Sequence, residues 1–230
     1  VPAAGQRGKT WRWAVGCYAA AYGIFHHAGT LFTPLGEVPL GVVLGQTRWA
    51  DWLDLFTPYL LVLLGVAALS QVALSHVAAA RRWWRWWAVF AVGAVTYVEG
   101  HGVHLSANSI GNRQPSELVH LWDETIGHYL QHSGLPLMTA ALMAALGRQQ
   151  RFPLVVALPL ALLAGMTHVT NALEGGTVYL GMVVAAGFSV WGWRRRGQAG
   201  EVLWWAYLPA LIALITYGMV RGGFTPPSAG

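Results

Sequence analysis

Apolar runs of about 20 residues dominate this chain, and an α-helix needs that length to cross a hydrocarbon core about 30 Å thick. The runs follow one another along all 230 residues, separated by short charged, glycine- or proline-containing stretches. Charged residues make up only 10% of the chain, whereas a soluble domain has about 25%. We therefore predict an all-α, polytopic integral membrane protein with a single domain over residues 1–230.

The apolar runs predict seven transmembrane helices. They cover Trp11–Gly29, Asp51–Ala79, Trp83–Leu105, Val119–Leu146, Phe152–Leu173, Thr177–Trp193 and Val202–Val220. A polar, proline-containing connection over residues 30–50 follows the first helix, and Ser106–Ser109 predicts a helix end and a turn after the third. No repeat or linker divides the domain.

Basic residues predict the orientation in the membrane. Alternate connections carry eleven of the 14 lysines and arginines: Arg7, Lys9, Arg12, Arg81, Arg82, Arg85, Arg148, Arg151, Arg194, Arg195 and Arg196. Only Arg48, Arg113 and Arg221 fall on the other side. The positive-inside rule places the first group and the N-terminus in the cytoplasm, and the C-terminus outside. The basic pI then reflects topology, and we expect no nucleic-acid partner.

Histidines and carboxylates gather at the opposite, extracytoplasmic side. Eight of the nine histidines fall there, and His76 is the exception; the eight are His26, His27, His101, His104, His120, His128, His132 and His168. All acidic residues except Glu201 have the same bias. Ionisable groups at membrane depth cost several kcal/mol, so they usually face the interior of the bundle and mark function.

Helical spacing predicts which of these side chains share a face. His120, Glu124, His128 and His132 follow one another at intervals of four residues, with Asp123 beside them. His101 and His104 are three residues apart, as are His168, Asn171 and Glu174, and Asp51 and Asp54. Glu99 lies off the face of His101 in an ideal helix, but Gly100 and Gly102 could loosen the turn and let it point inward.

Imidazole and carboxylate side chains on facing helices are how helical bundles build metal sites, and this donor set suits zinc, iron or manganese. We predict a divalent metal site, with zinc ahead of iron. Its predicted ligands are His101, His104, His120, His128, His168 and Glu174, and its predicted catalytic carboxylates are Asp123, Glu124 and Glu99.

Two reactions fit such a site. In the first, one zinc with an open position activates water, and Asp123 or Glu124 acts as the general base in hydrolysis of a lipid-like substrate that arrives from the membrane. In the second, two irons share bridging carboxylates in a membrane oxidase or hydroxylase. The extracytoplasmic position favours the hydrolase, and the excess of ligands favours the di-iron enzyme.

Seven helices with a histidine and aspartate cluster near one leaflet resemble the membrane zinc hydrolases of the alkaline ceramidase and adiponectin-receptor type. Those families carry two histidines separated by three residues on the last helix. This chain has that spacing at His128 and His132, on the fourth predicted helix. The resemblance implies a reaction class, namely zinc-dependent hydrolysis, and no residue roles.

Other functions use the same residues. His128 or His132 with His168 could ligate haem in a b-type cytochrome, and an acidic, histidine-rich vestibule is typical of a metal or proton transporter. A purely structural polar network and a subunit of a larger membrane complex remain open. A retinal Schiff base is excluded in its usual form, because Lys9, the only lysine, precedes the first helix. The expected partners are membrane lipids and a lipid-soluble substrate.

Overall fold

The structure is a computed structural model that describes residues 4–27, 49–75, 83–146, 149 and 151–225. The described part of the chain is all-helical, which confirms the predicted all-α class. The predicted connection at residues 30–50, apart from its last two residues, and His76, Arg81, Arg82 and Arg148 lie outside the described residues. The helices are α1 (Ala4–Phe25), α3 (Trp49–Ser75), α4 (Trp83–Gly111), α5 (Glu117–His120), the π-helix η4 (Leu121–Gly127), α6 (His128–Leu146), α7 (Leu154–Glu174), α8 (Val178–Arg194), the 3₁₀ turn η5 (Ala199–Glu201) and α9 (Val202–Arg221).

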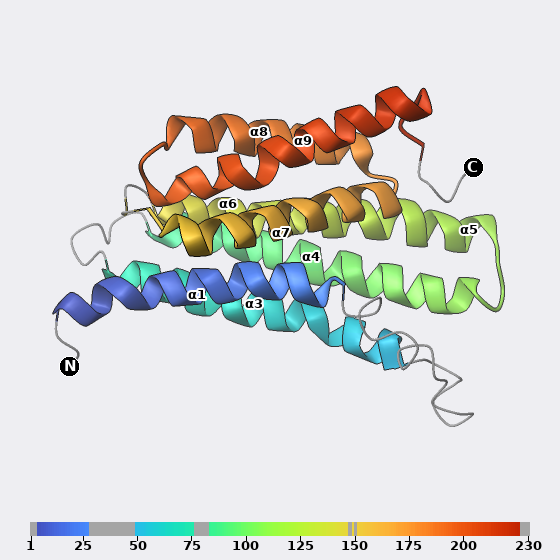
Figure 1. The fold of residues 1–230 in the computed structure, drawn as a ribbon. Helices are drawn as coiled ribbons and strands as arrows, with labels where there is room; N and C mark the ends of the chain where they lie inside the picture. Colours follow the sequence, from blue (N-terminus) through green and yellow to red (C-terminus); the bar gives the residue numbers. More distant parts are fainter. Residues whose placement is uncertain (1–3, 28–48, 76–82, 147–148, 150, 226–230) are drawn as a thin grey trace.

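The long helices lie alongside one another, and α5, η4 and α6 form one continuous rod (Figure 1). Helix α1 begins at one end of the bundle and α9 finishes at the opposite end. We call the end where α1, α4, α7 and α9 finish the histidine end. The other end carries tryptophans beside arginines, for example Arg196, whose guanidinium lies 3.2 Å from the ring centroid of Trp193.

Three of the described helices are long and apolar enough to cross a membrane. The qualifying stretches are Asp51–Ala73, Leu154–Glu174 and Ala199–Arg221. Their outer faces carry many large exposed apolar side chains, including Leu63, Val155 and Met219, each more than 60% exposed. Exposed apolar surface of this extent is typical of a lipid or protein interface.

Glycines allow α4 and α6 to approach at backbone distance. A Cβ atom at Gly93 would lie 2.7 Å from the carbonyl oxygen of Gly134, and one at Gly127 would lie 2.9 Å from the backbone of His104. A Cβ atom at Gly100 would collide with the backbone nitrogen of Gln131. Gly93 and Gly100 lie seven residues apart on α4, and Gly127, the last residue of η4, lies seven residues before Gly134 of α6, so each pair recurs on one face of its rod. This contact fixes how closely the histidines of the two helices meet.

Two local expectations need correction. The stretch Ser106–Ser109 does not end a helix, because α4 continues to Gly111 and only then turns. The interval of four residues from His120 to His132 does not form one stripe, because η4 interrupts the α-helix between them. A π-helix has a wider turn, so His120 is exposed while His128 is buried.

Candidate functional site

The candidate site lies at the histidine end, where η4 faces the last turns of α4. π-helical turns are rare in proteins, but those that occur often lie at functional sites. Here the wide turn places Asp123 and Glu124 beside the imidazoles of α4 and α6. We use the name histidine cluster for His101, His104, His128 and His132, which come from α4 and α6.

His104 and Asp123 form a short polar contact between α4 and η4. His104 Nδ1 lies 2.6 Å from Asp123 Oδ1, and both side chains are largely buried. A carboxylate accepts hydrogen bonds, so Nδ1 carries the proton and the Nε2 of a neutral His104 keeps a free lone pair. The carboxylate therefore orients the ring as it does in carboxylate–histidine pairs around metals.

His128 stacks between the two neighbouring histidines. Its ring centroid lies 4.2 Å from that of His104 and 5.6 Å from that of His132, with only 11° between the planes of the second pair. His128 Nδ1 donates to the backbone carbonyl oxygen of Glu124 at 3.2 Å, which again leaves Nε2 without a proton in the neutral ring. Partial burial and the nearby Asp123 carboxylate raise the pKa of Glu124.

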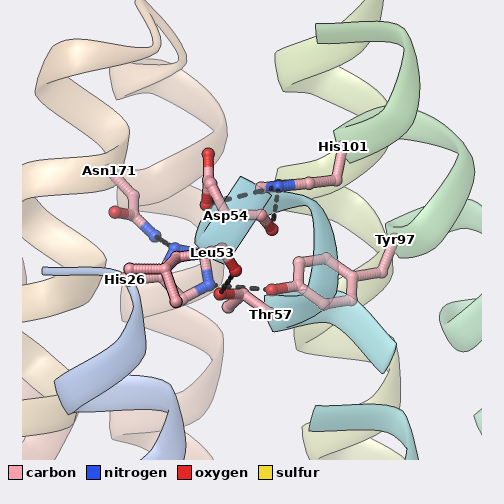
Figure 2. Close-up of polar contacts among 7 residues, drawn as sticks. All are labelled: His26, Leu53, Asp54, Thr57, Tyr97, His101 and Asn171. Atoms are coloured by element: carbon pink, nitrogen blue, oxygen red, sulfur yellow. Dashed lines mark hydrogen bonds and ion pairs between the residues drawn. The ribbon is translucent and has the colours of Figure 1, made fainter. Parts of the chain in front are cut away.

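His101 contacts Asp54 of helix α3 (Figure 2). Pro58 has no N–H, so the carbonyl oxygen of Asp54, four residues earlier, lacks its helical donor. His101 Nε2 donates to this oxygen at 3.0 Å and lies 3.4 Å from the Asp54 carboxylate. The other nitrogen, His101 Nδ1, is buried and has no hydrogen-bond partner among the residues that the structure describes.

A second hydrogen-bonded group lies next to His101 and joins three helices (Figure 2). The amide of Asn171 donates to His26 Nδ1 at 3.3 Å, so His26 Nε2 carries the proton and donates to the Tyr97 hydroxyl at 2.8 Å. The ring centroids of Tyr97 and His101 are 6.3 Å apart. Helices α1, α4 and α7 are thus linked by one tautomer of His26.

His132 and His168 line a separate small pocket with Thr177 and Asn171. His132 Nδ1 lies 2.6 Å from the hydroxyl of Thr177, the residue before α8. His168 Nε2 donates to the carbonyl oxygen of Gly181 at 3.0 Å, and its ring centroid lies 5.1 Å from that of Tyr207. His168 therefore packs towards α8 and α9 rather than joining the stacked rings.

Within the described ranges, these tautomers leave one nitrogen without a hydrogen-bond partner on each of three neighbouring rings. These are Nδ1 of His101 and Nε2 of His104 and His128, as their other nitrogens donate to oxygen atoms. In the ranges that the structure describes, no group of three or more His, Cys, Asp or Glu side chains is already placed to hold a metal ion. The donor atoms are available, but they do not converge on one point in this arrangement.

The structure gathers some of the predicted site residues and separates others. His101, His104, His128, Asp123 and Glu124 lie close together. The other four predicted residues lie elsewhere. His120 and Glu174 are exposed, and Glu99 is exposed on the outer face of α4. His168 is buried and lines the neighbouring pocket.

Several polar partners were not among the predicted site residues. Asp54 carries a signal that could have found it, namely a proline four residues later that frees its carbonyl oxygen. Thr177, Tyr97 and Asn171 carry no local signal that singles out their histidine partners, because each contact depends on how distant helices pack.

Comparisons of the chain with protein-family models, with curated proteins and with solved structures gave no match.

Proposed function

We propose that the chain is a cell-membrane protein with seven transmembrane helices, an N-terminus in the cytoplasm and a C-terminus outside. Three apolar helices and the one-sided distribution of arginines support this topology. The rod from α5 to α6 covers residues 117–146, about ten more than a hydrocarbon core requires. If Leu146 lies at the cytoplasmic boundary, Asp123 and Glu124 lie beyond the hydrocarbon, on the extracytoplasmic side.

We further propose that the histidine cluster binds a divalent metal, with zinc as the first candidate, in an enzyme that hydrolyses a lipid-like substrate. One observation carries this proposal: His101, His104 and His128 each donate an N–H hydrogen bond to an oxygen atom, and the second nitrogen of each ring has no partner in the part of the chain that the structure describes. Metal-ligating histidines have this arrangement almost always, because the second hydrogen bond fixes the tautomer. Binding of one ion requires the three rings to rotate until the free nitrogens converge.

The residues around the cluster have separate roles in this scheme. A bound zinc would supply a water molecule with a pKa near 7 and an electrophilic centre. Asp123 orients His104 through the 2.6 Å hydrogen bond. Glu124, partly exposed and 3.5 Å from His128 Nδ1, is the proposed general base.

A proton path is a second candidate, and the ring spacing favours it. The centroids of His101, His104, His128 and His132 follow one another at 6.3, 4.2 and 5.6 Å. Chains of histidine and acidic residues carry protons in membrane pumps and transporters. A protein with this function would acidify vesicles in response to a potential without binding metal.

Metal analysis of the purified protein, combined with an optical spectrum, tests the proposal. Stoichiometric zinc without visible bands supports the hydrolase, and iron without a Soret band supports a di-iron oxidase instead. A Soret band would identify a haem protein and contradict both. His128→Ala should lose the metal, whereas the matched control His120→Ala should keep it, because His120 is exposed and outside the cluster. If the purified wild-type protein holds no metal and transports protons, a proton path replaces the enzyme as the proposed function.

A further inference from the structure

A groove on the outer side of the bundle is separate from the histidine cluster. It lies between α3, α4 and the start of the α5–α6 rod, has a volume of about 600 Å³ and is open on one side. Ligand pockets have volumes of about 300–1,000 Å³ and combine apolar walls with a few polar groups. Its polar and aromatic lining comes from Tyr59, Glu99, Ser106 and Trp122, and the other lining residues are glycine and aliphatic side chains.

Glu99 is the only charged residue among the described residues that line the groove. It is exposed, and no hydrogen bond or ion pair joins it to another residue in the part of the chain that the structure describes. Two residues along a helix correspond to about 200° of rotation, so Glu99 faces away from His101. Glu99, Gly102, Val103 and Ser106 share one face and all line the groove.

In the proposed topology the groove crosses the outer boundary of the hydrocarbon. Trp83, Trp84, Trp86 and Trp87 mark the cytoplasmic boundary of α4, and about 20 helical residues span the core. The outer boundary then falls near Leu105, with Glu99 about 9 Å on the hydrocarbon side and Ile110 about 8 Å beyond it. A carboxylate at this depth is costly unless a positive charge accompanies it.

The other polar walls fit the same kind of ligand. Tyr59 is 52% exposed and Trp122 is 45% exposed, so their rings are available to a ligand in the groove. Aromatic rings attract cations through the negative face of the π system, and aromatic residues are the usual recognition element for ammonium groups. The Ser106 hydroxyl adds a hydrogen-bond acceptor for an N–H donor.

We propose that this groove binds an amphiphile with a positively charged ammonium head group, held by Glu99 and the rings of Tyr59 and Trp122. Its hydrocarbon chain leaves the open side of the groove and enters the membrane. This inference uses the membrane placement proposed above and does not depend on a metal in the histidine cluster. It assigns a ligand site to a carboxylate that faces away from the cluster.

Calorimetric titration of dodecylammonium into the protein in maltoside micelles tests the proposal, with a titration into empty micelles subtracted. Dodecylammonium should bind in a saturable manner with one site per chain. Dodecanol, which has the same chain without the charge, should bind at least tenfold more weakly, and so should methylammonium, which has the charge without the chain.

Variants decide whether the groove is responsible. Glu99→Gln should weaken dodecylammonium binding about tenfold or more, because a charge-assisted contact is lost. Gly102→Leu should weaken it to a similar degree by filling the groove, since no atom lies within 4 Å of a Cβ atom at this position. The matched control Glu174→Gln, which removes an exposed carboxylate at the same end of the bundle, should bind as the wild type does.

Equal affinity in wild type and Glu99→Gln would overturn the proposal, as would equal affinity for dodecanol. Cross-linking between copies through Ser106→Cys, together with no binding of dodecylammonium by the wild type, would show that the groove is a protein interface instead. His128→Ala should lose metal and keep dodecylammonium binding, so failure of the metal proposal and failure of this one are distinguishable.

Discussion

The two faces of α4 carry ionisable residues in the same short stretch and use them in opposite ways. The inner face presents His101 and His104, which are packed against α3 and α6 and hydrogen-bonded to oxygen atoms. The outer face presents Glu99, which is exposed and has no partner among the described residues. The difference teaches that the helix face, rather than the local density of charges, decides which residues form a shared site.

Glycine substitutions on the two faces of α4 should differ most in their effect on stability. Gly100→Ala places a Cβ atom against the backbone of Gln131 and 2.8 Å from the carbonyl oxygen of Gly127, so α4 and α6 must separate. We expect a loss of about 3 kcal/mol in the free energy of unfolding, seen as a lower Tm in detergent. Gly102→Ala on the outer face meets no atom within 4 Å and should raise stability by about 0.5–1 kcal/mol. Equal Tm values for the two variants would contradict the close contact between α4 and α6 at Gly100.

Removal of the η4 carboxylate that contacts the inner face of α4 should have the next largest effect, which is on metal binding. Asp123→Asn removes the charge that orients His104. Loss of such a second hydrogen-bond partner lowers metal affinity about 10- to 100-fold. Competition with a chelator measures this effect. Glu117→Gln is the control, because Glu117 is exposed at the start of α5 and its loss should leave affinity unchanged. An Asp123→Asn variant with wild-type affinity would remove Asp123 from the site.

A smaller effect is expected where α6 meets the start of α8, next to the histidine cluster. Thr177→Val deletes the hydroxyl that lies 2.6 Å from His132 Nδ1 and leaves a largely buried nitrogen without a partner. The expected cost is about 1–3 kcal/mol of stability, measured by thermal unfolding. Thr170→Val is the control, since the only hydrogen bond of the Thr170 hydroxyl among the described residues goes to the Thr167 carbonyl within its own helix, and its cost should be smaller. A larger loss of stability in Thr170→Val than in Thr177→Val would argue against a hydrogen bond between His132 and Thr177.

The outer face should give the smallest change in stability. Glu99→Gln removes no contact in the described part of the chain, so the free energy of unfolding should stay within about 0.5 kcal/mol of the wild type. Thermal unfolding without added amphiphile measures this. A loss above 2 kcal/mol would reveal that Glu99 supports the fold and would remove the distinction between the faces.

The sequence predicted the helices better than their contacts. The predicted range Val202–Val220 agrees with α9 at Val202–Arg221 within one residue, because apolar run length is a local property. The predicted stripe through His120 failed, since spacing rules assume an ideal α-helix and η4 is a π-helix. The bond between His101 and the Asp54 carbonyl joins residues 47 positions apart, and only the packing of α3 on α4 reveals it.

The spacing of the glycines is a sequence signal for the contact between α4 and α6. Gly93 and Gly100, like Gly127 and Gly134, are seven residues apart, and such small residues permit close helix contact in membranes. This pattern could have paired the third and fourth predicted helices and brought His104 next to His128. It could not have shown that Asp123 faces His104, because that contact depends on the wide turn of η4.

X-ray absorption at the zinc edge of zinc-loaded protein tests the central claim most directly, because it reports the nearest ligands of the ion. The account predicts one zinc per chain with two or three imidazole nitrogens at about 2.0–2.1 Å, and loss of at least one imidazole in His128→Ala but not in His120→Ala. A zinc bound only by oxygen atoms, or a spectrum that His128→Ala leaves unchanged, would contradict the assignment of the histidine cluster as a metal site.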